Sequence, residues 1–166
     1  NAVEKLNNQK KLTEAALKAP LETTRAAAVK RLTNQEVIVK IAATDESVYV
    51  RMEALRVCTD DLFLAKFACA INHERLALAA VERIRSEQFL ELVAQATNNR
   101  DVRIAAATRI KDETLLVCIA AEMPEYGAWK VLDRIEEFPD SAEQFRVLSS
   151  SAKDSKVRTE VKIRLA

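Results

Sequence analysis

The chain has 166 residues, of which 49% are hydrophobic but only 5% aromatic, and it contains one glycine. Tight β-hairpins need glycine at left-handed positions, so this composition argues against a multi-stranded sheet and favours helices. The 26 Lys and Arg residues balance 25 Asp and Glu residues, so net charge gives no bulk attraction to nucleic acid or to membranes.

The sequence repeats itself with a period of 26 residues over five copies. A row of alanines shows the period, at Ala2, Ala28, Ala54, Ala80 and Ala106. A fixed period between about 20 and 50 residues is typical of solenoids, whose units bury their apolar faces against neighbouring units. The expected fold class is therefore all-α: an α-solenoid, or superhelix, of about six two-helix repeats.

Each copy is predicted to contain two short helices, as the second copy illustrates. Residues 25–32 carry apolar side chains on one stripe, as a first helix would. Residues 35–43 form the second helix, with Ile38 and Ile41 on its packed side. A break precedes the second helix of each copy and is occupied by residue types that favour helix N-caps: Asn8, Asn34, Asp60, Ser86 and Asp112.

The fifth copy departs from this pattern. Its first helix is expected around residues 129–135, and its second helix follows about four extra residues and a cap at Ser141. Residues 149–154 are predicted to form a loop, and a further first helix is expected over residues 157–165. Because neither end carries the polar face of a solenoid cap, residues 1–166 are expected to be a single repeat domain and a segment of a longer array.

Three segments place Val-Arg at the start of an alanine-rich helix, after a polar loop: Val50-Arg51, Asn99-Arg-Asp-Val-Arg103 and Asp154-Ser-Lys-Val-Arg158. On these segments the chain resembles the HEAT-like helical repeats, above all the short bacterial kind that grades into leucine-rich repeat variants. The resemblance implies a helical-repeat fold and leaves function open, since the fold hosts many functions. The iron–sulfur cluster of some leucine-rich repeat variant proteins is not expected, because the three cysteines are scattered.

Arginines recur near the start of the first helices, at Arg25, Arg51, Arg103 and Arg158. Such a ladder can bind anions, or each guanidinium can bridge neighbouring repeats through a carboxylate or a carbonyl oxygen. We favour the structural interpretation. The third copy has Ala77 at this position, so the ladder is interrupted there.

A second basic row shares one register and comprises Lys5, Arg31, Arg83, Arg109 and Arg134. Rows of arginine can follow a phosphate backbone, and some HEAT-like proteins are DNA glycosylases, so this row is a candidate anion site. The alternative is a solvated helix face paired with acids such as Glu82 and Asp133. Because the chain is close to neutral, nucleic acid is the less favoured partner.

The second helices are apolar almost all round, which indicates either burial between adjacent repeats or an apolar groove. An apolar groove would suit a helix or an extended peptide of a protein partner. In that case the partner-binding residues of the concave face are Val39, Lys40, Ala65, Lys66, Leu92, Gln95, Val117 and Cys118.

The sequence offers little for catalysis. The only histidine, His73, is interpreted as a polar helix-start residue, and no glycine-rich phosphate loop, zinc spacing or nucleophile elbow occurs. Scattered cysteines, no apolar run of bilayer length and no signal-peptide pattern predict a cytoplasmic protein. We therefore predict a non-enzymatic protein-binding scaffold without metal or cofactor. The alternatives are a nucleic-acid-binding or DNA-repair protein on the same fold, and a purely structural spacer.

Overall fold

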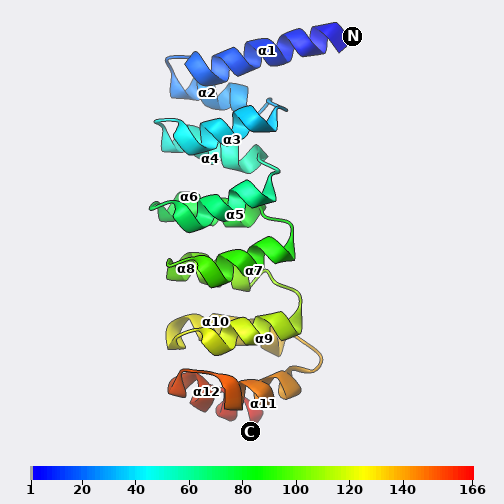
Figure 1. Ribbon diagram of the computed structural model, residues 1–166, viewed down its shortest axis with the longest axis vertical. Coiled ribbons are helices and arrows are strands. Elements are labelled where there is room, and N and C mark those ends of the chain that lie inside the picture. The colour runs from blue at the N-terminus through cyan, green and yellow to red at the C-terminus, as the bar shows by residue number, and fades with distance from the viewer. Residues whose placement is uncertain (1) are drawn as a thin grey trace. The chain divides into compact units, whose positions relative to one another are not determined.

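The structure is a computed structural model that describes residues 2–166, apart from the side chains of residues 2–7 and 125–126. The predicted anion-site residue Lys5 lies outside the described side chains. Residues 2–166 are all-helical and contain no strand, as the sequence predicted (Figure 1). The helices are α1 (Ala2–Lys18), α2 (Glu22–Val29), α3 (Gln35–Thr44), α4 (Val48–Val57), α5 (Asp61–Ala70), α6 (Glu74–Arg83), α7 (Glu87–Ala96), α8 (Arg100–Ala107), α9 (Glu113–Glu122), α10 (Glu125–Glu136), α11 (Ser141–Ser151) and α12 (Ser155–Leu165).

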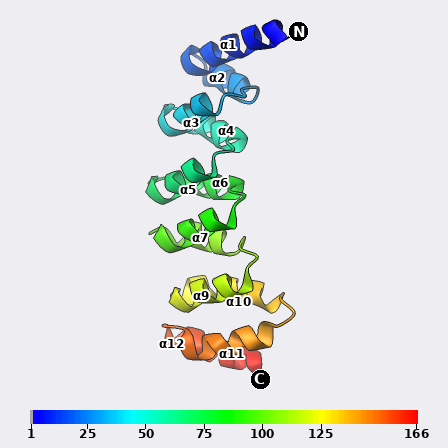
Figure 2. The same cartoon turned by 45° about the vertical axis from the view of Figure 1, so that its right-hand side comes forward.

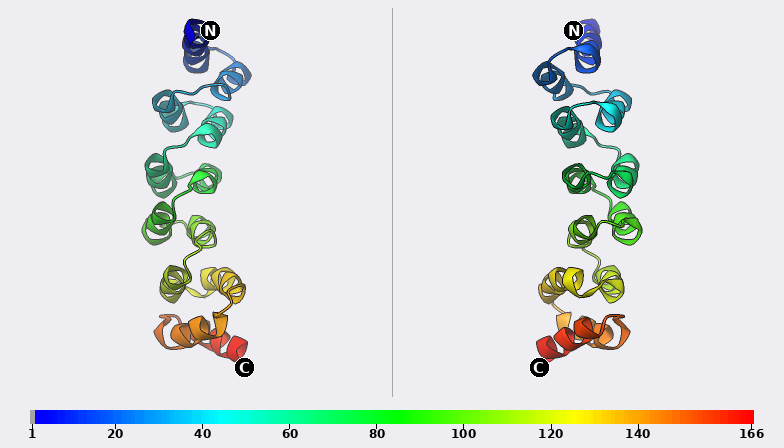
Figure 3. Two further views of the ribbon diagram at one scale, coloured as in Figure 1. Left: turned by 90° about the vertical axis from the view of Figure 1, so that its right-hand side faces the viewer. Right: turned by 90° about the vertical axis from the view of Figure 1, so that its left-hand side faces the viewer.

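The helices group into two compact units, unit 1 (Asn1–Ile84) and unit 2 (Arg85–Ala166). In unit 1 the helices pack in successive pairs, α1 with α2, α3 with α4 and α5 with α6, and in unit 2 the pairs are α7 with α8, α9 with α10 and α11 with α12. Successive even-numbered helices also pack against one another within each unit. In unit 2 the odd-numbered helices α7, α9 and α11 form a second packed row. Each unit is thus a two-layer stack of helix pairs, the arrangement of an α-solenoid, which Figures 2 and 3 show side-on and end-on.

Large aliphatic side chains at repeated positions fill the space between the layers. Leu55 and Leu64 are fully buried in unit 1, and Leu116 and Leu132 are fully buried in unit 2. Small residues lie among them, and Ala68 is only 2% exposed. Because alanine lets helices approach to about 8–10 Å, helices of ten residues can bury enough surface to hold the stack together. In the part of the chain that the structure describes, no helix combines the length and the apolar character that crossing a bilayer requires.

Capping side chains start the second helices at three of the predicted positions. The Asn34 Oδ1 accepts hydrogen bonds from two backbone amides of α3, at 3.0 and 3.2 Å. Asp60 and Asp112 accept one amide each, at 2.9 and 2.8 Å, and thereby satisfy donors that the first turn of a helix leaves unpaired. Ser86 occupies the N-cap position of α7 but makes no side-chain cap bond to that helix.

The prediction of a helix start at Asn8 is wrong. Asn8 lies inside α1, which continues from Ala2 to Lys18. A capping residue starts a helix only where the chain before it is held extended. At the caps Asn34 and Asp112 this is achieved by the buried side chains of Leu32 and Ile110, two residues earlier. Around Asn8 the backbone stays helical through the polar residues.

In three copies the residue after the predicted cap position accepts a hydrogen bond from a backbone amide in the linker of the next copy. The Gln9 Oε1 accepts a hydrogen bond from the Thr33 amide at 3.1 Å, and the Gln35 Oε1 accepts one from the Thr59 amide at 2.8 Å. In unit 2, the Glu87 Oε1 accepts the amide of Lys111 at 3.1 Å. These bonds recur at the repeat period and satisfy backbone donors in the extended linkers.

The fifth copy differs from the prediction in two details. Helix α11 begins at Ser141, but its N-cap residue is Asp140, which makes no side-chain cap bond. The predicted loop over residues 149–154 begins only at Ala152, because the three serines before it continue the helix. Their hydroxyls donate to carbonyl oxygens three or four residues earlier, which lets serine remain in a helix.

Removing a cap gives a first testable prediction. We expect Asp60→Ala to lower the free energy of unfolding by about 0.5–2 kcal/mol, because the Phe63 amide loses its acceptor. Urea denaturation followed by circular dichroism measures this loss. Asn72→Ala, at an exposed loop position of the same unit, is the matched control and should change stability by less than about 0.5 kcal/mol. Equal effects of the two substitutions would contradict the capping role.

Candidate functional site

A groove of about 640 Å³ lies within unit 2, on the side formed by the second helices α7, α9 and α11. Its volume falls within the range of about 300–1,000 Å³ typical of pockets that hold small ligands or short segments. The lining residues are Ala94, Gln95, Arg103, Val117, Cys118, Ile119, Ala121, Glu122, Met123, Val147 and Ser151.

The floor of the groove is apolar. Ala94, Val117 and Met123 are only 3%, 4% and 2% exposed, so they belong to the core as well as to the groove. Val147 stands on the α11 side and is 44% exposed, and Cys118 of α9 is also exposed. Helix α9 is apolar on nearly every side, so it packs into the core with one face and leaves another for the groove.

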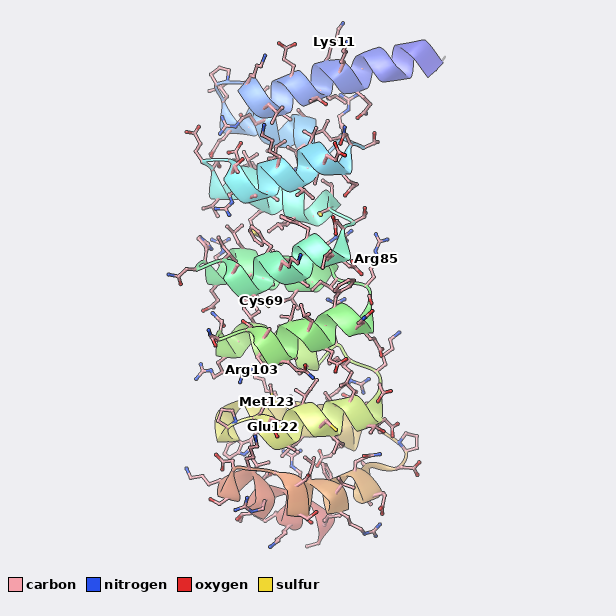
Figure 4. All side chains as sticks on the ribbon, in the orientation of Figure 1. Lys11, Cys69, Arg85, Arg103, Glu122 and Met123 are labelled. Atoms are coloured by element: carbon pink, nitrogen blue, oxygen red, sulfur yellow. The ribbon has the colours of Figure 1, made fainter. Side chains whose placement is uncertain are left out.

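One cation lines this apolar surface. Arg103 projects from α8, and its Nη2 donates to the Thr97 carbonyl oxygen at 2.6 Å, just beyond the end of α7. The Nε of Arg103 is buried and has no hydrogen-bond partner. Figure 4 shows Arg103 in the same region as Glu122 and Met123, at the end of α9.

The other three ladder arginines also bond carbonyl oxygens at or just beyond the end of the preceding helix. Arg51 donates to Ala42 at 2.8 Å, and Arg158 donates to Ala152 at 2.6 Å. Arg25 donates to the Ala19 carbonyl oxygen at 3.0 Å. These bonds satisfy helix-end acceptors, the bridging role that the sequence analysis favoured for the ladder.

Arg25 differs from the other ladder arginines in having carboxylates within reach. Its Nε and Nη2 donate to the two Asp45 oxygens at 2.9 and 3.1 Å, and Glu46 lies at 3.1 Å. The hydrogen bond to Asp45 is the main reason that the pKa of Arg25 is raised, against the desolvation that lowers it. The buried guanidinium of Arg25 is therefore neutralised within its own repeat pair.

Three of the eight predicted partner-binding residues, Gln95, Val117 and Cys118, line the unit 2 groove. Leu92 of α7 is 42% exposed but does not line it. In unit 1, the predicted position Ala65 is fully buried and cannot meet a partner, because that side of α5 packs into the core. The remaining unit 1 positions are half-buried or exposed: Val39, Lys40 and Lys66.

The basic row lies near the ends of the first helices. Arg31 and Arg109 are exposed in the turns after α2 and α8. Arg83 is half-buried at the end of α6. Arg134 of α10 pairs with Glu137 at 2.7 Å and lies over the Phe138 ring, 4.6 Å from its centroid.

The only histidine has a structural position. His73 is the N-cap residue of α6, and its Nδ1 accepts a hydrogen bond from the Leu76 amide at 3.4 Å. Among the described residues, no three His, Cys, Asp or Glu side chains gather as a metal site would require.

The three thiols differ in exposure, which gives a second prediction. Cys58 is fully buried, and burial raises the pKa of its thiol as well as that of the half-buried Cys69. Because the thiolate is the reactive form, we expect iodoacetamide at neutral pH to label Cys118 first, then Cys69 and last Cys58. Mass spectrometry of tryptic peptides at successive times measures the order. Labelling of Cys58 before Cys118 would contradict the packing of unit 1.

Sequence reasoning missed several groove residues, among them Arg103 as a groove cation, Met123 and Val147. Arg103 was placed in the structural ladder, and nothing in the ladder pattern separates it from the other arginines. The fifth copy carries an insertion before α11, so the position of Val147 in the repeat could not be read from the period. One signal was available: the sequence has the uncharged Met123 at the repeat position of Asp45, the residue that pairs with Arg25.

Comparison with known proteins returns no matching family model and no matching curated protein. The HEAT-like family therefore remains a resemblance, carried by the 26-residue period and the Val-Arg segments.

Proposed function

We propose that this chain is a HEAT-like, non-enzymatic protein-binding module, and that the groove of unit 2 receives a short segment of a partner protein. The observation that carries the proposal is an open groove with an apolar floor between the second helices, where Val147 and Cys118 are left exposed. Exposed apolar surface in a concave site is typical of peptide and protein recognition. The three free cysteines fit a reducing compartment, so the proposal places the module in the cytoplasm.

The construction of the groove on packed helices supports binding over catalysis. The groove is built on α7, α9 and α11, whose side chains pack into the core of unit 2. A preformed groove costs a ligand little ordering entropy. Its lining carries Cys118, Arg103 and Glu122 as its reactive or charged groups, and Glu122 forms an ion pair with Lys153. Because Glu122 is paired with Lys153, it is not positioned as a base for the Cys118 thiol, and these residues form no nucleophile–base pair.

A selection experiment tests the proposal. A display library of random nine-residue peptides is selected against the folded chain, and the enriched peptides are synthesised with a fluorescent label. We expect them to bind the wild type in fluorescence polarisation and to bind Val147→Trp about tenfold more weakly or worse, because the indole fills the groove. Leu62→Trp is the matched control, since Leu62 is also exposed, at 46%, but lies in unit 1. Peptides that bind both variants like the wild type would refute the proposed site.

The nucleic-acid alternative rests on the basic row. Few of the arginines in that row are available to bind phosphate groups. Arg134 is engaged by Glu137 and Phe138, and Arg83 is half-buried. We therefore expect no duplex-DNA binding in fluorescence polarisation at about 50 mM salt. Binding that weakens steeply towards about 200 mM salt, and is lost in the Arg31→Ala/Arg83→Ala/Arg109→Ala variant, would favour the alternative instead.

A further inference from the structure

We infer that the groove of unit 2 selects an acidic peptide segment, with an Asp or Glu carboxylate of the partner on Arg103 and flanking apolar side chains on the groove floor. This inference rests on the proposed function and names the chemistry of its ligand.

Arg103 is a charge without a counter-charge. Among the described residues, the side chain of Arg103 makes one hydrogen bond, to the neutral Thr97 carbonyl oxygen, and its Nε is buried without a partner. Because the Nε is closed to solvent, a ligand in the groove would bond the Nη groups of Arg103 and would balance the charge that they share with the Nε. A carboxylate is the acceptor that suits a guanidinium best, since two N–H groups can bond its two oxygens side by side.

Comparison with Arg25, the first arginine of the ladder, shows which neutralising groups Arg103 does not have. Arg25 is met by carboxylates 20 and 21 positions later in the sequence, Asp45 and Glu46. At the same spacing from Arg103 the sequence has Met123 and Pro124. Neither residue carries a charge, and Met123 lines the groove, so Arg103 does not have the neutralising carboxylates that Arg25 has. Arg51 also lacks these acids, but it lies over the Phe67 ring, 5.5 Å from the centroid.

The other polar side chains of the groove are already engaged. Glu122 is exposed and forms an ion pair with Lys153. The Gln95 Nε2 donates to the Glu91 carboxylate at 3.0 Å, and the Ser151 hydroxyl donates to the Val147 carbonyl oxygen at 2.9 Å. With these groups satisfied, Arg103 is the cation of the groove lining that lacks an acidic partner.

The surroundings of Arg103 define the rest of the ligand. Ala94, Val117 and Met123 form an apolar floor, and Val147 adds an exposed apolar side. A ligand that carried only a carboxylate would leave this surface unfilled, and a purely apolar one would bury Arg103 further without a partner. An acidic residue flanked by apolar residues meets both requirements, because it adds apolar burial to a charge-assisted hydrogen bond.

The peptides from the selection described above test the inference through Arg103. We expect the enriched sequences to share an Asp or Glu beside apolar residues, and Glu→Gln in the peptide to weaken binding about tenfold or more. Arg103→Gln should weaken the acidic peptide by a similar factor and make the chain indifferent to the Glu→Gln change. Arg103→Lys, which keeps the charge, should retain part of the affinity.

Arg51→Gln is the matched control for any loss of structure. It removes a guanidinium that also caps a helix-end carbonyl, but in unit 1, so it should leave peptide binding unchanged. Circular dichroism melting of every variant establishes that it is folded at the assay temperature. If Arg103→Gln does not fold, two other measurements test the same point. The first is the loss of affinity of the Glu→Gln peptide for the wild-type chain. The second compares Val147→Glu with Leu62→Glu, since a new carboxylate in the groove should repel an acidic ligand.

The outcomes separate the inference from the proposed function. Peptides without acidic residues, or acidic peptides that bind Arg103→Gln as they bind the wild type, would overturn the inference. If those peptides are still blocked by Val147→Trp, the groove remains a peptide site and only its proposed chemistry falls. If no enriched peptide responds to Val147→Trp, both fall together.

Discussion

Leu116→Ala is expected to lower the free energy of unfolding by about 2–5 kcal/mol. Leu116 is fully buried in α9, the middle one of the three helices that form the groove. Truncation removes its packing contacts and leaves a cavity between short helices, which have few other contacts to compensate. Urea denaturation gives the size of the loss, and hydrogen exchange with mass spectrometry shows which helices open.

The location of the opening is the more informative result. In a repeat stack each pair of helices contacts its neighbours, so damage should spread locally. We expect faster exchange first in α9 and in the helices packed against it, α7, α10 and α11. Leu64→Ala, at the repeat position of Leu116 in unit 1, is the control and should open α5 and α6 first. Identical exchange patterns for the two variants would contradict a stack with local contacts.

Ala94→Leu is expected to cost about 1–3 kcal/mol and to weaken peptide binding about tenfold or more. Ala94 is 3% exposed on α7 and also lines the groove. The isobutyl side chain of leucine must either push α7 away from its neighbours or protrude into the groove. Thermal melting and fluorescence polarisation with a selected peptide measure the two effects on one variant.

Ala68→Leu separates packing from binding. Ala68 occupies the repeat position of Ala94 in unit 1, is 2% exposed and does not line the unit 2 groove. It should lose stability by a similar amount and keep its affinity for the peptide. An unchanged melting temperature in both variants would show that this alanine row does not lie where helices cross.

The helical repeat could be predicted because each copy carries the same local signals. The second helix of the second copy was expected over residues 35–43 and is Gln35–Thr44 in the structure. Asn34 and Asp60 cap as expected, since a short polar side chain at this position satisfies amides of its own first turn. Such signals involve only neighbouring residues and can be read from the sequence.

The predictions that failed depended on contacts outside the local sequence. Asn8 has the residue type of a cap but lies in a continuous helix, which runs from Ala2 to Lys18. Ala65 was predicted to face a partner but is fully buried. Its helix is apolar on most sides, so the 26-residue period does not show which side is buried. The serines before Ala152 look like a loop in sequence, yet their hydroxyls bond carbonyl oxygens of α11.

The groove could be predicted only in part. Gln95, Val117 and Cys118 were expected on the binding side of the second helices, and they line it. Arg103 was not expected there, because its ladder position explains it equally well as a helix-end cap. The sequence shows Met123 where Asp45 stands in the second copy, but the pairing of Asp45 with Arg25 becomes apparent only in three dimensions.

The most direct test of the central claim, that the unit 2 groove holds a peptide, is the alkylation rate of Cys118 in the presence and absence of a selected peptide. Cys118 is exposed in the groove, and Cys69 in unit 1 is an internal reference within the same molecule. Saturating peptide should slow the labelling of Cys118 about tenfold or more and leave the rate at Cys69 unchanged. An unchanged rate at Cys118 under saturating peptide would mean that the peptide binds elsewhere and would contradict the account.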